Sequence, residues 1–240
     1  AQYLNTSRRA AELIKYASNA FLATKVTFIN ELANLCEKTN INIEDISIGM
    51  GLDKRIGGRF LRAGPAYGGS CFPKDTKAIM NTAERFKINL SVIKSVIKSN
   101  ENRSNLLLNR IKNLLKNRIK NKNICFLGVT FKANTDDMRD TQCLKIFPKL
   151  LKKGVKISYY EPTGEKKELK NLLFKKNSDE ILKYNDLIVI HTEWDEFRSL
   201  NFNKVKSKKL IIFDMRNLYQ PNSFLNKNIT YYSIGRSLND

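Results

Sequence analysis

Residues 63–75, Ala-Gly-Pro-Ala-Tyr-Gly-Gly-Ser-Cys-Phe-Pro-Lys-Asp, form the densest local concentration of glycine and proline in a chain with 11 glycines and 5 prolines. Gly68–Gly69 permits a positive φ, or a close approach to a ligand, just before Cys71. Lys74 and Asp75 follow, and a nearby cation favours the nucleophilic thiolate form of a cysteine. Two interpretations stay open here. The stretch is either a reactive cysteine loop or a glycine-rich turn with a buried, inert cysteine, in which Asp75 caps the next helix.

The segments on either side of this loop have helical periodicity. Apolar residues recur at helical spacing over residues 6–38, on more than one side, and Thr6 or Ser7 is placed to cap the start. A helix with apolar residues on more than one side needs a second surface to cover them. We therefore expect it to form the core of a helical domain or of a dimer. We expect a short helix at 43–49, one at 75–86, and a long one from Asn89 or Ser91 to about residue 117 that connects two domains.

From residue 120 the pattern changes to strands that alternate with helices. Strands are expected at 123–129, 155–160, 187–191 and 210–213, with an edge strand at 230–233, and helices at 141–153, 166–174 and 178–183. This alternation predicts a doubly wound parallel sheet, so the fold class is α/β. Gly128 stands alone after the first strand, without the G-x-G-x-x-G fingerprint of a dinucleotide site. We expect a helical domain over 1–88, a connecting helix over 89–119 and the sheet domain over 120–240.

Composition limits the choice of partners and compartment. The chain has 240 residues and a formal charge of +20, which favours anionic partners. The lysines are scattered and form no basic arm, so we expect neither nucleic acid nor a membrane as a partner. Cysteines 36, 71, 125 and 143 have no C-x-x-C spacing, and one histidine is present, so no zinc pattern arises. We expect a cytoplasmic protein without a metal, in which Cys36 and Cys125 are core residues.

Three further polar stretches carry possible chemistry. Lys15 and Asn19 lie four residues apart and project from one helix face, either into solvent or together toward an oxyanion. Residues 131–140 hold a cation at each end of a polar loop, which is either an ordinary loop or a phosphate site that Arg216 joins. Residues 53–60 are a basic turn that is merely solvated or reaches a neighbouring site.

Together, these stretches resemble the nucleotide-diphosphate-sugar 6-dehydrogenases. The residues that carry the resemblance lie in order along the chain, at 12–23, 28–31, 55–57, 68–75, 128–139 and 216–217. Phe72-Pro73 after the cysteine is similar to the branch that acts on UDP-glucose. The family has an N-terminal NAD-binding domain, a helical dimerisation domain and a Rossmann-like UDP-sugar domain. The sequence resembles the last two, so we expect a partial chain that is inactive alone.

The resemblance also implies a reaction and the residues that carry it. The implied reaction is a two-step, NAD-dependent oxidation of UDP-glucose to UDP-glucuronate through a cysteine thiohemiacetal and thioester. The implied catalytic residues are Cys71, Lys15, Asn19 and Asp75. The implied substrate-binding residues are Lys15, Arg55, Phe60, Leu61, Arg62, Ala63, Gly64, Gly68, Lys132 and Arg216. Lys74 and Arg139 are implied contacts of NAD, most of which the N-terminal domain of the family holds.

The resemblance implies a homodimer through the N-terminal helices, in which Arg55 reaches the sugar of the partner subunit. Two alternative functions stay open. One is a related dehydrogenase that acts on another nucleotide sugar, and the other is a non-catalytic nucleotide-binding module.

Overall fold

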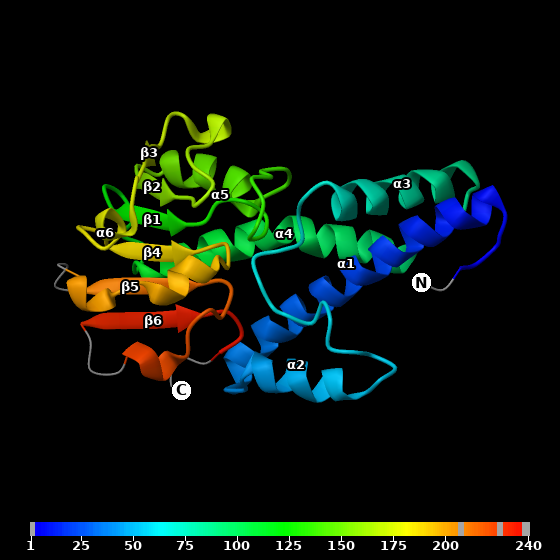
Figure 1. Ribbon diagram of the computed structural model, residues 1–240, viewed down its shortest axis with the longest axis horizontal. Helices are drawn as coiled ribbons and strands as arrows, with labels where there is room; N and C mark the ends of the chain where they lie inside the picture. Colours follow the sequence, from blue (N-terminus) through cyan, green and yellow to red (C-terminus); the bar gives the residue numbers. More distant parts are fainter. Residues whose placement is uncertain (1–2, 206–208, 225–227, 237–240) are drawn as a thin grey trace.

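The computed structural model describes residues 3–205, 209–224 and 228–236 and has two parts, a group of long helices and a sheet flanked by helices (Figure 1). The helices are α1 (Arg8–Thr39), α2 (Ile43–Leu52), α3 (Cys71–Arg85) and α4 (Ser91–Leu114). In Figure 1, α1 and α3 lie side by side, and α4 passes from them to the sheet. α2 lies beside the end of the sheet that carries β6 (Ile229–Ser233).

The first helix is continuous, and its ends follow ordinary capping rules. Ala10 N donates to the Ser7 side chain at 3.2 Å, so Ser7 is the N-cap that the sequence offered as one of two candidates. The helix ends at Asn40, whose φ of 56° is left-handed. α2 was expected to end at Gly49 but runs to Leu52, and Gly51 in its last turn lies close to the following loop. A Cβ at Gly51 would lie 2.9 Å from the Cα of Gly58.

The helix after the cysteine loop begins earlier than its sequence suggests. It was expected to start at Asp75 but starts at Cys71, with Ser70 in the cap position. Pro73 fits there because the first-turn N–H groups of a helix have no intrahelical acceptor. The cap role considered for Asp75 is therefore wrong: its carboxylate instead accepts a hydrogen bond from Asn19, at 2.5 Å. Cys71 becomes the first residue of a helix and is exposed.

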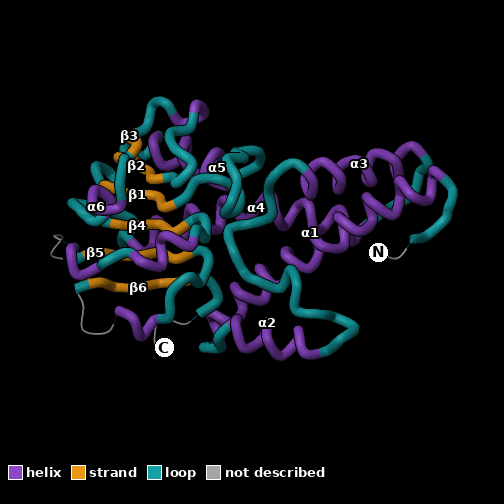
Figure 2. Tube along the Cα trace, in the orientation of Figure 1, coloured by secondary structure: helices purple, strands orange, loops and turns teal. Residues whose placement is uncertain are grey.

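The second part is a parallel sheet in the order β3-β2-β1-β4-β5-β6, which confirms the doubly wound prediction (Figure 2). The strands are β1 (Asn123–Leu127), β2 (Lys156–Tyr160), β3 (Leu173–Phe174), β4 (Leu187–Ile190), β5 (Leu210–Asp214) and β6. Between them lie α5 (Gln142–Leu151), α6 (Ser178–Ile181) and the 3-10 turns Lys167–Leu169, Asp195–Ser199, Phe202–Lys204 and Pro221–Phe224. β6 lies at the edge, as expected.

One predicted helix is wrong. Residues 166–174 form the short turn η1 (Lys167–Leu169) and then the edge strand β3. Leu173 pairs with Ser158 of β2, and Lys175 N donates to Tyr159 O at 2.8 Å. The segment forms a strand because it hydrogen-bonds to the otherwise unpaired edge of β2. The helix expected at 178–183 is shortened to α6.

A single apolar cluster joins the two parts. It contains Ile29 and Ala33 of α1, Ile111 of α4, and Phe126 and Phe213 of the sheet, all buried. A second cluster fills the other face of the sheet, where Cys125 lies between the strands and the 3-10 turns. Cys36 and Cys125 are core residues, as predicted, and Cys143 is buried as well. The helical part and the sheet are thus held at a fixed orientation by shared packing.

Candidate functional site

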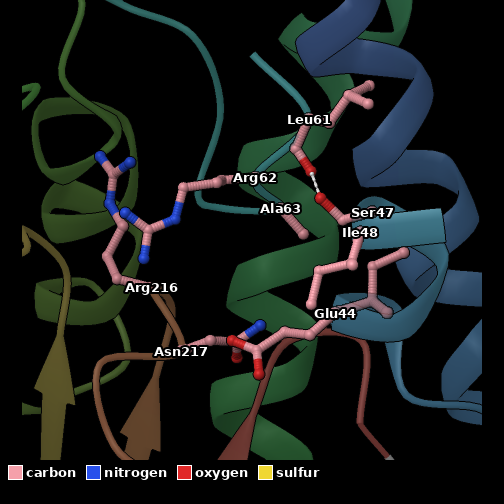
Figure 3. A pocket seen from close by; sticks show the side chains of 9 residues that line it. Glu44, Ser47, Ile48, Leu61, Arg62, Ala63, Arg216 and Asn217 are labelled. Atoms are coloured by element: carbon pink, nitrogen blue, oxygen red, sulfur yellow. Dashed lines mark hydrogen bonds between the residues drawn. The ribbon is translucent and has the colours of Figure 1, made fainter. Parts of the chain in front are cut away.

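A cavity of about 300 Å³ lies between α2 and the carboxyl edge of the sheet (Figure 3). It is lined by Ile43, Glu44, Ser47, Ile48, Leu61, Arg62, Ala63, Arg216 and Asn217. Ligands of doubly wound sheets bind at this edge. The structure therefore brings together four of the predicted substrate-binding residues, which are Leu61, Arg62, Ala63 and Arg216.

The helix α2 supplies one wall of the cavity. Its residues 43, 44, 47 and 48 share one helix face. Ser47 Oγ donates to Leu61 O at 2.6 Å, which ties the loop to the helix. The sequence analysis missed Glu44, Ser47 and Ile48. Their helical spacing was visible in the sequence, but no motif marked this face as a binding surface.

Arg216 forms the opposite wall, in the turn after β5. The buried Asp214 carboxylate accepts from Arg216 N at 2.8 Å and from Leu218 N at 2.7 Å, which fixes the turn. Burial raises the pKa of Asp214. The Arg216 guanidinium donates to His191 O and Phe131 O, both at 2.9 Å.

Arg216 also forms an ion pair with Glu193, at 2.7 Å. Figure 3 shows its guanidinium on the same side of the cavity as that of Arg62, which is exposed. Glu193 balances the positive charge of Arg216. The guanidinium of Arg62 adds a second positive charge at the cavity, which favours the binding of an anion.

The cysteine loop is packed against the loop that follows β1. A Cβ at Gly68 would lie 2.7 Å from Asp140 O, and one at Gly69 would lie 2.6 Å from the Phe131 ring. Gly69 has a φ of +75°, and its N–H donates to Arg139 O at 2.8 Å. Gly69 thus has the positive φ that the sequence allowed, and the close approach at the glycine pair is to another loop; an approach to a ligand stays a prediction.

Two of the predicted catalytic side chains, Asn19 and Asp75, are hydrogen-bonded to each other, and Asp75 lies one helical turn after Cys71. Asn19 Nδ2 of α1 donates to the Asp75 carboxylate of α3, which is fully buried. The other oxygen, Asp75 Oδ1, lies 3.5 Å from Lys74 Nζ and has no hydrogen-bond partner among the described residues. Lys15 lies one helical turn before Asn19, is exposed, and has its Nζ 5.7 Å from the Tyr16 ring centroid. The predicted oxyanion role of Lys15 and Asn19 stays a prediction.

The remaining predicted residues lie on exposed loops. Arg139 donates to Asp137 at 2.9 and 2.8 Å, and this hydrogen bonding lowers the pKa of Asp137. Arg55 forms the same kind of pair with Asp53 and is 90% exposed. Lys132 is exposed, with its Nζ 5.5 Å from the Phe131 ring centroid.

Phe60 has a left-handed φ of 65°, and its ring centroid lies 5.9 Å from that of Phe72. Within the described ranges, no three His, Cys, Asp or Glu side chains lie together as a metal site would require. No helix in those ranges has the length and apolar character needed to cross a bilayer.

Comparisons with known proteins identify the class. The central domain of the UDP-glucose/GDP-mannose dehydrogenase family matches residues 9–102, and the UDP binding domain of the same family matches residues 125–221. The chain therefore belongs to the UDP-glucose/GDP-mannose dehydrogenase family.

Individual relatives refine this result. The chain is 45% identical to the UDP-glucose 6-dehydrogenase of Rickettsia prowazekii, a match that covers 99% of this chain and 56% of that protein. It is 42% identical to the enzyme of the same name from Rhizobium meliloti, over 96% of this chain and 54% of that protein. A UDP-glucose dehydrogenase structure from Pyrobaculum islandicum has a TM-score of 0.85 at 27% identity, covering 97% of this chain and 52% of that one. The chain spans about half the length of the curated relatives it matches.

Proposed function

We propose that this chain is the nucleotide-binding and cysteine-bearing part of a UDP-glucose 6-dehydrogenase, which oxidises UDP-glucose to UDP-glucuronate. The observation that carries the proposal is the cavity with two arginines, Arg62 and Arg216, connected through residues 64–70 to an exposed cysteine at the start of a helix. A guanidinium pair matches the charge and geometry of a diphosphate. The names of the relatives support UDP-glucose as the substrate.

The residues near Cys71 suit a covalent route. The sugar C6 alcohol is first oxidised to an aldehyde, and the Cys71 thiolate then forms a C–S bond to that carbon, giving a thiohemiacetal. A second two-electron oxidation gives a thioester. Water then breaks the C–S bond, which releases the carboxylate and restores the thiol. Asn19 and Lys15 stabilise the oxyanions, and the Asp75 carboxylate holds the attacking water through Oδ1.

Lys74 and Arg139 fit a role in holding NAD. Both side chains are mostly exposed cations, with exposed fractions of 64% and 68%; Lys74 lies in the first turn of α3, and Arg139 lies on the loop packed against the cysteine loop. Cations of this kind suit the pyrophosphate of a dinucleotide. NAD, when bound, accepts the hydride in each oxidation.

A second copy of the chain is the proposed partner of α1. Ile14, Phe21, Phe28 and Leu35 are spaced by seven residues on this helix and are 48%, 66%, 47% and 57% exposed. Side chains at this spacing form one stripe along a helix, and a stripe of this kind packs well against its own copy. Arg55 is mostly exposed and would have to exchange its ion pair with Asp53 to reach across such an interface.

Titration with UDP tests the nucleotide site directly. We expect the chain to bind UDP in calorimetry and to bind GDP at least tenfold more weakly, with Arg216→Ala reducing the UDP affinity at least tenfold. Absence of UDP binding would contradict the proposal. Equal binding of GDP would instead favour a related dehydrogenase that acts on another nucleotide sugar.

The covalent route is tested in a chimera that joins this chain to the N-terminal part of the Rickettsia prowazekii relative. Cys71→Ser is expected to stop formation of UDP-glucuronate, while Ser70→Ala, one residue away, leaves it within severalfold. Normal formation of UDP-glucuronate by Cys71→Ser would rule out the covalent route through the cysteine. The proposal that the chain binds UDP would still stand.

A further inference from the structure

Two polar side chains of α4 are buried against the loop that precedes Cys71. Asn100 and Arg103 are 8% and 5% exposed in the middle of this helix. Arginine and asparagine are rarely this buried, and burial of a polar group is costly unless it is hydrogen-bonded. Their hydrogen-bond partners therefore show what these side chains hold in place.

Arg103 binds the backbone of the loop. Its Nε and Nη2 donate to Gly64 O at 3.3 and 3.1 Å, and its Nη1 donates to Asn30 O at 3.1 Å and to Asn34 Oδ1 at 2.8 Å. None of these hydrogen-bond acceptors is a carboxylate, and the negative charges of Glu37 and Glu31 act on the guanidinium without bonding to it directly. Burial lowers the pKa of Arg103 to about 10, and the side chain stays protonated at neutral pH.

Asn100 binds the same loop three residues further along. Its Oδ1 accepts from Tyr67 N at 3.0 Å, and its Nδ2 donates to Tyr67 O at 3.1 Å. Asn30 Oδ1 of α1 accepts from Gly64 N at 2.8 Å. Side chains of α1 and α4 thus take up both the N–H and the carbonyl of Gly64 and of Tyr67. The backbone of the loop is therefore held at both residues by side chains of the two helices.

This segment lies between the two halves of the proposed site. At one end, a Cβ at Gly64 would lie 3.3 Å from Arg216 Nη1, and the preceding Ala63 lines the cavity. At the other end, Tyr67 is followed by the glycine pair and Cys71. A shift of Gly64 would therefore change both the cavity wall beside Arg216 and the path of the chain to the cysteine.

We propose that Arg103 and Asn100 are positioning residues, which hold residues 64–67 so that the nucleotide cavity and Cys71 keep one fixed relation. The inference rests on the proposed function, because the cavity is taken to bind the UDP part of the substrate. Neither side chain lines that cavity, so both act through the backbone of the loop. The fork of donors on arginine is needed, because the compact ammonium group of a lysine cannot reach Gly64 O, Asn30 O and Asn34 Oδ1 together.

The experiment compares UDP affinity with stability in four variants of the chain. Arg103→Lys and Asn100→Asp are expected to weaken UDP binding at least tenfold in calorimetry. Leu107→Ala is the control for destabilisation, because Leu107 is a buried apolar residue one turn further along α4. We expect it to lower the melting temperature at least as much as the test variants, with UDP affinity within twofold. Asn109→Ala, at an exposed site on α4, is expected to change neither.

The outcomes separate this inference from the function on which it rests. If the unaltered chain does not bind UDP, the proposed function and the positioning role are both contradicted. If it binds UDP and the two test variants keep their affinity within twofold, or if Leu107→Ala weakens binding as much as they do, the positioning role is overturned and the function stands. If Arg103→Lys does not fold, Asn100→Asp decides the question, because it keeps the acceptor for Tyr67 N and removes the donor to Tyr67 O.

Discussion

The Asp75 carboxylate is fully buried and accepts a hydrogen bond from Asn19, a residue of another helix. The sequence placed Lys15 and Asn19 on one helix face and placed Asp75 close to Cys71. It could not place Asn19 against Asp75, because that contact depends on how α1 packs on α3. The choice between helix cap and site residue for Asp75 was open in the sequence, and the structure removes the first possibility.

The residues of the cavity and of the loop beside it were not equally predictable from the sequence. Arg216 was expected because it follows a strand at the carboxyl edge of the sheet, where ligands bind. Arg62 and Arg216 come from distant parts of the chain, so only the resemblance to a family, and no local pattern, put them in one site. Asn100 and Arg103 were missed altogether, since on a helix an isolated Asn and Arg are usually solvated.

His191 predicts a pH dependence of stability at the residue scale. It is buried beside Arg216, and burial, followed by the charge of Arg216, lowers its pKa from 6.5 to about 3. The unfolded chain therefore binds one more proton than the folded chain between these values, so the free energy of unfolding falls as the pH drops through this range. The loss due to His191 is about 2 kcal/mol between pH 7 and pH 5, at about 1.4 kcal/mol per unit below the unfolded pKa.

Urea unfolding at pH 7 and pH 5 measures this loss. His191 is the single histidine of the chain, so His191→Gln removes its titration without affecting another imidazole. We expect the variant to lose about 2 kcal/mol less than the unaltered chain between these two pH values. Equal losses in the two proteins would show that His191 is not held neutral.

At the scale of elements, the helix α3 shows where sequence reasoning is weakest. Pro73 and the glycine pair suggested that a loop continues to Asp75, yet a proline within the first helical turn is fully compatible with a helix. The predicted helix at 166–174 failed for another reason, since Leu173 and Phe174 gain a strand partner that only the folded sheet provides. The long periodic helices α1 and α4 and the apolar strands β1 and β5 were predicted correctly in kind.

Gly69 gives a prediction about how the cysteine loop is held. Gly69→Ala is expected to destabilise the chain in two ways, through its left-handed φ of +75° and through a clash with the Phe131 ring. The first effect costs about 1–2 kcal/mol and the second about 1–3 kcal/mol more. Gly57→Ala is the matched control, because Gly57 has a φ of +67° and no atom within 4 Å of an added Cβ.

Urea or thermal unfolding of the two variants separates strain from contact. Gly69→Ala is expected to lower the free energy of unfolding more than Gly57→Ala does. Equal losses would mean that the loop after β1 does not press on the cysteine loop, and that the packing of Gly69 on Phe131 carries no energy.

At the scale of the whole molecule, the apolar stripe on α1 predicts self-association. Phe21→Glu places a charge at the most exposed of its four residues, so we expect the unaltered chain to sediment as a dimer and this variant as a monomer. Leu173→Glu, on the edge strand β3 and 60% exposed, is the control and should remain dimeric. A monomeric unaltered chain at micromolar concentration would contradict the predicted interface.

The fold class was predictable because alternating strands and helices leave few arrangements for a parallel sheet. The division of the chain into ranges 1–88, 89–119 and 120–240 stays a prediction. The two family models that match it leave the middle of the chain between them, where α4 ends and β1 begins. How tightly the two parts are joined was not visible in the sequence, since shared packing is a property of surfaces that meet only in the folded chain.

The apolar cluster that runs from α1 through α4 into the sheet packs the two parts against each other as one core. The spacing between the arginines of the cavity and the sulfur of Cys71 is thus set by the covalent chain and the core together. Under the proposed function, this spacing would have to match the distance from a diphosphate to the far carbon of one hexose. A nucleotide sugar with a longer or shorter span would then bring the wrong atom to Cys71, whatever contacts its sugar makes.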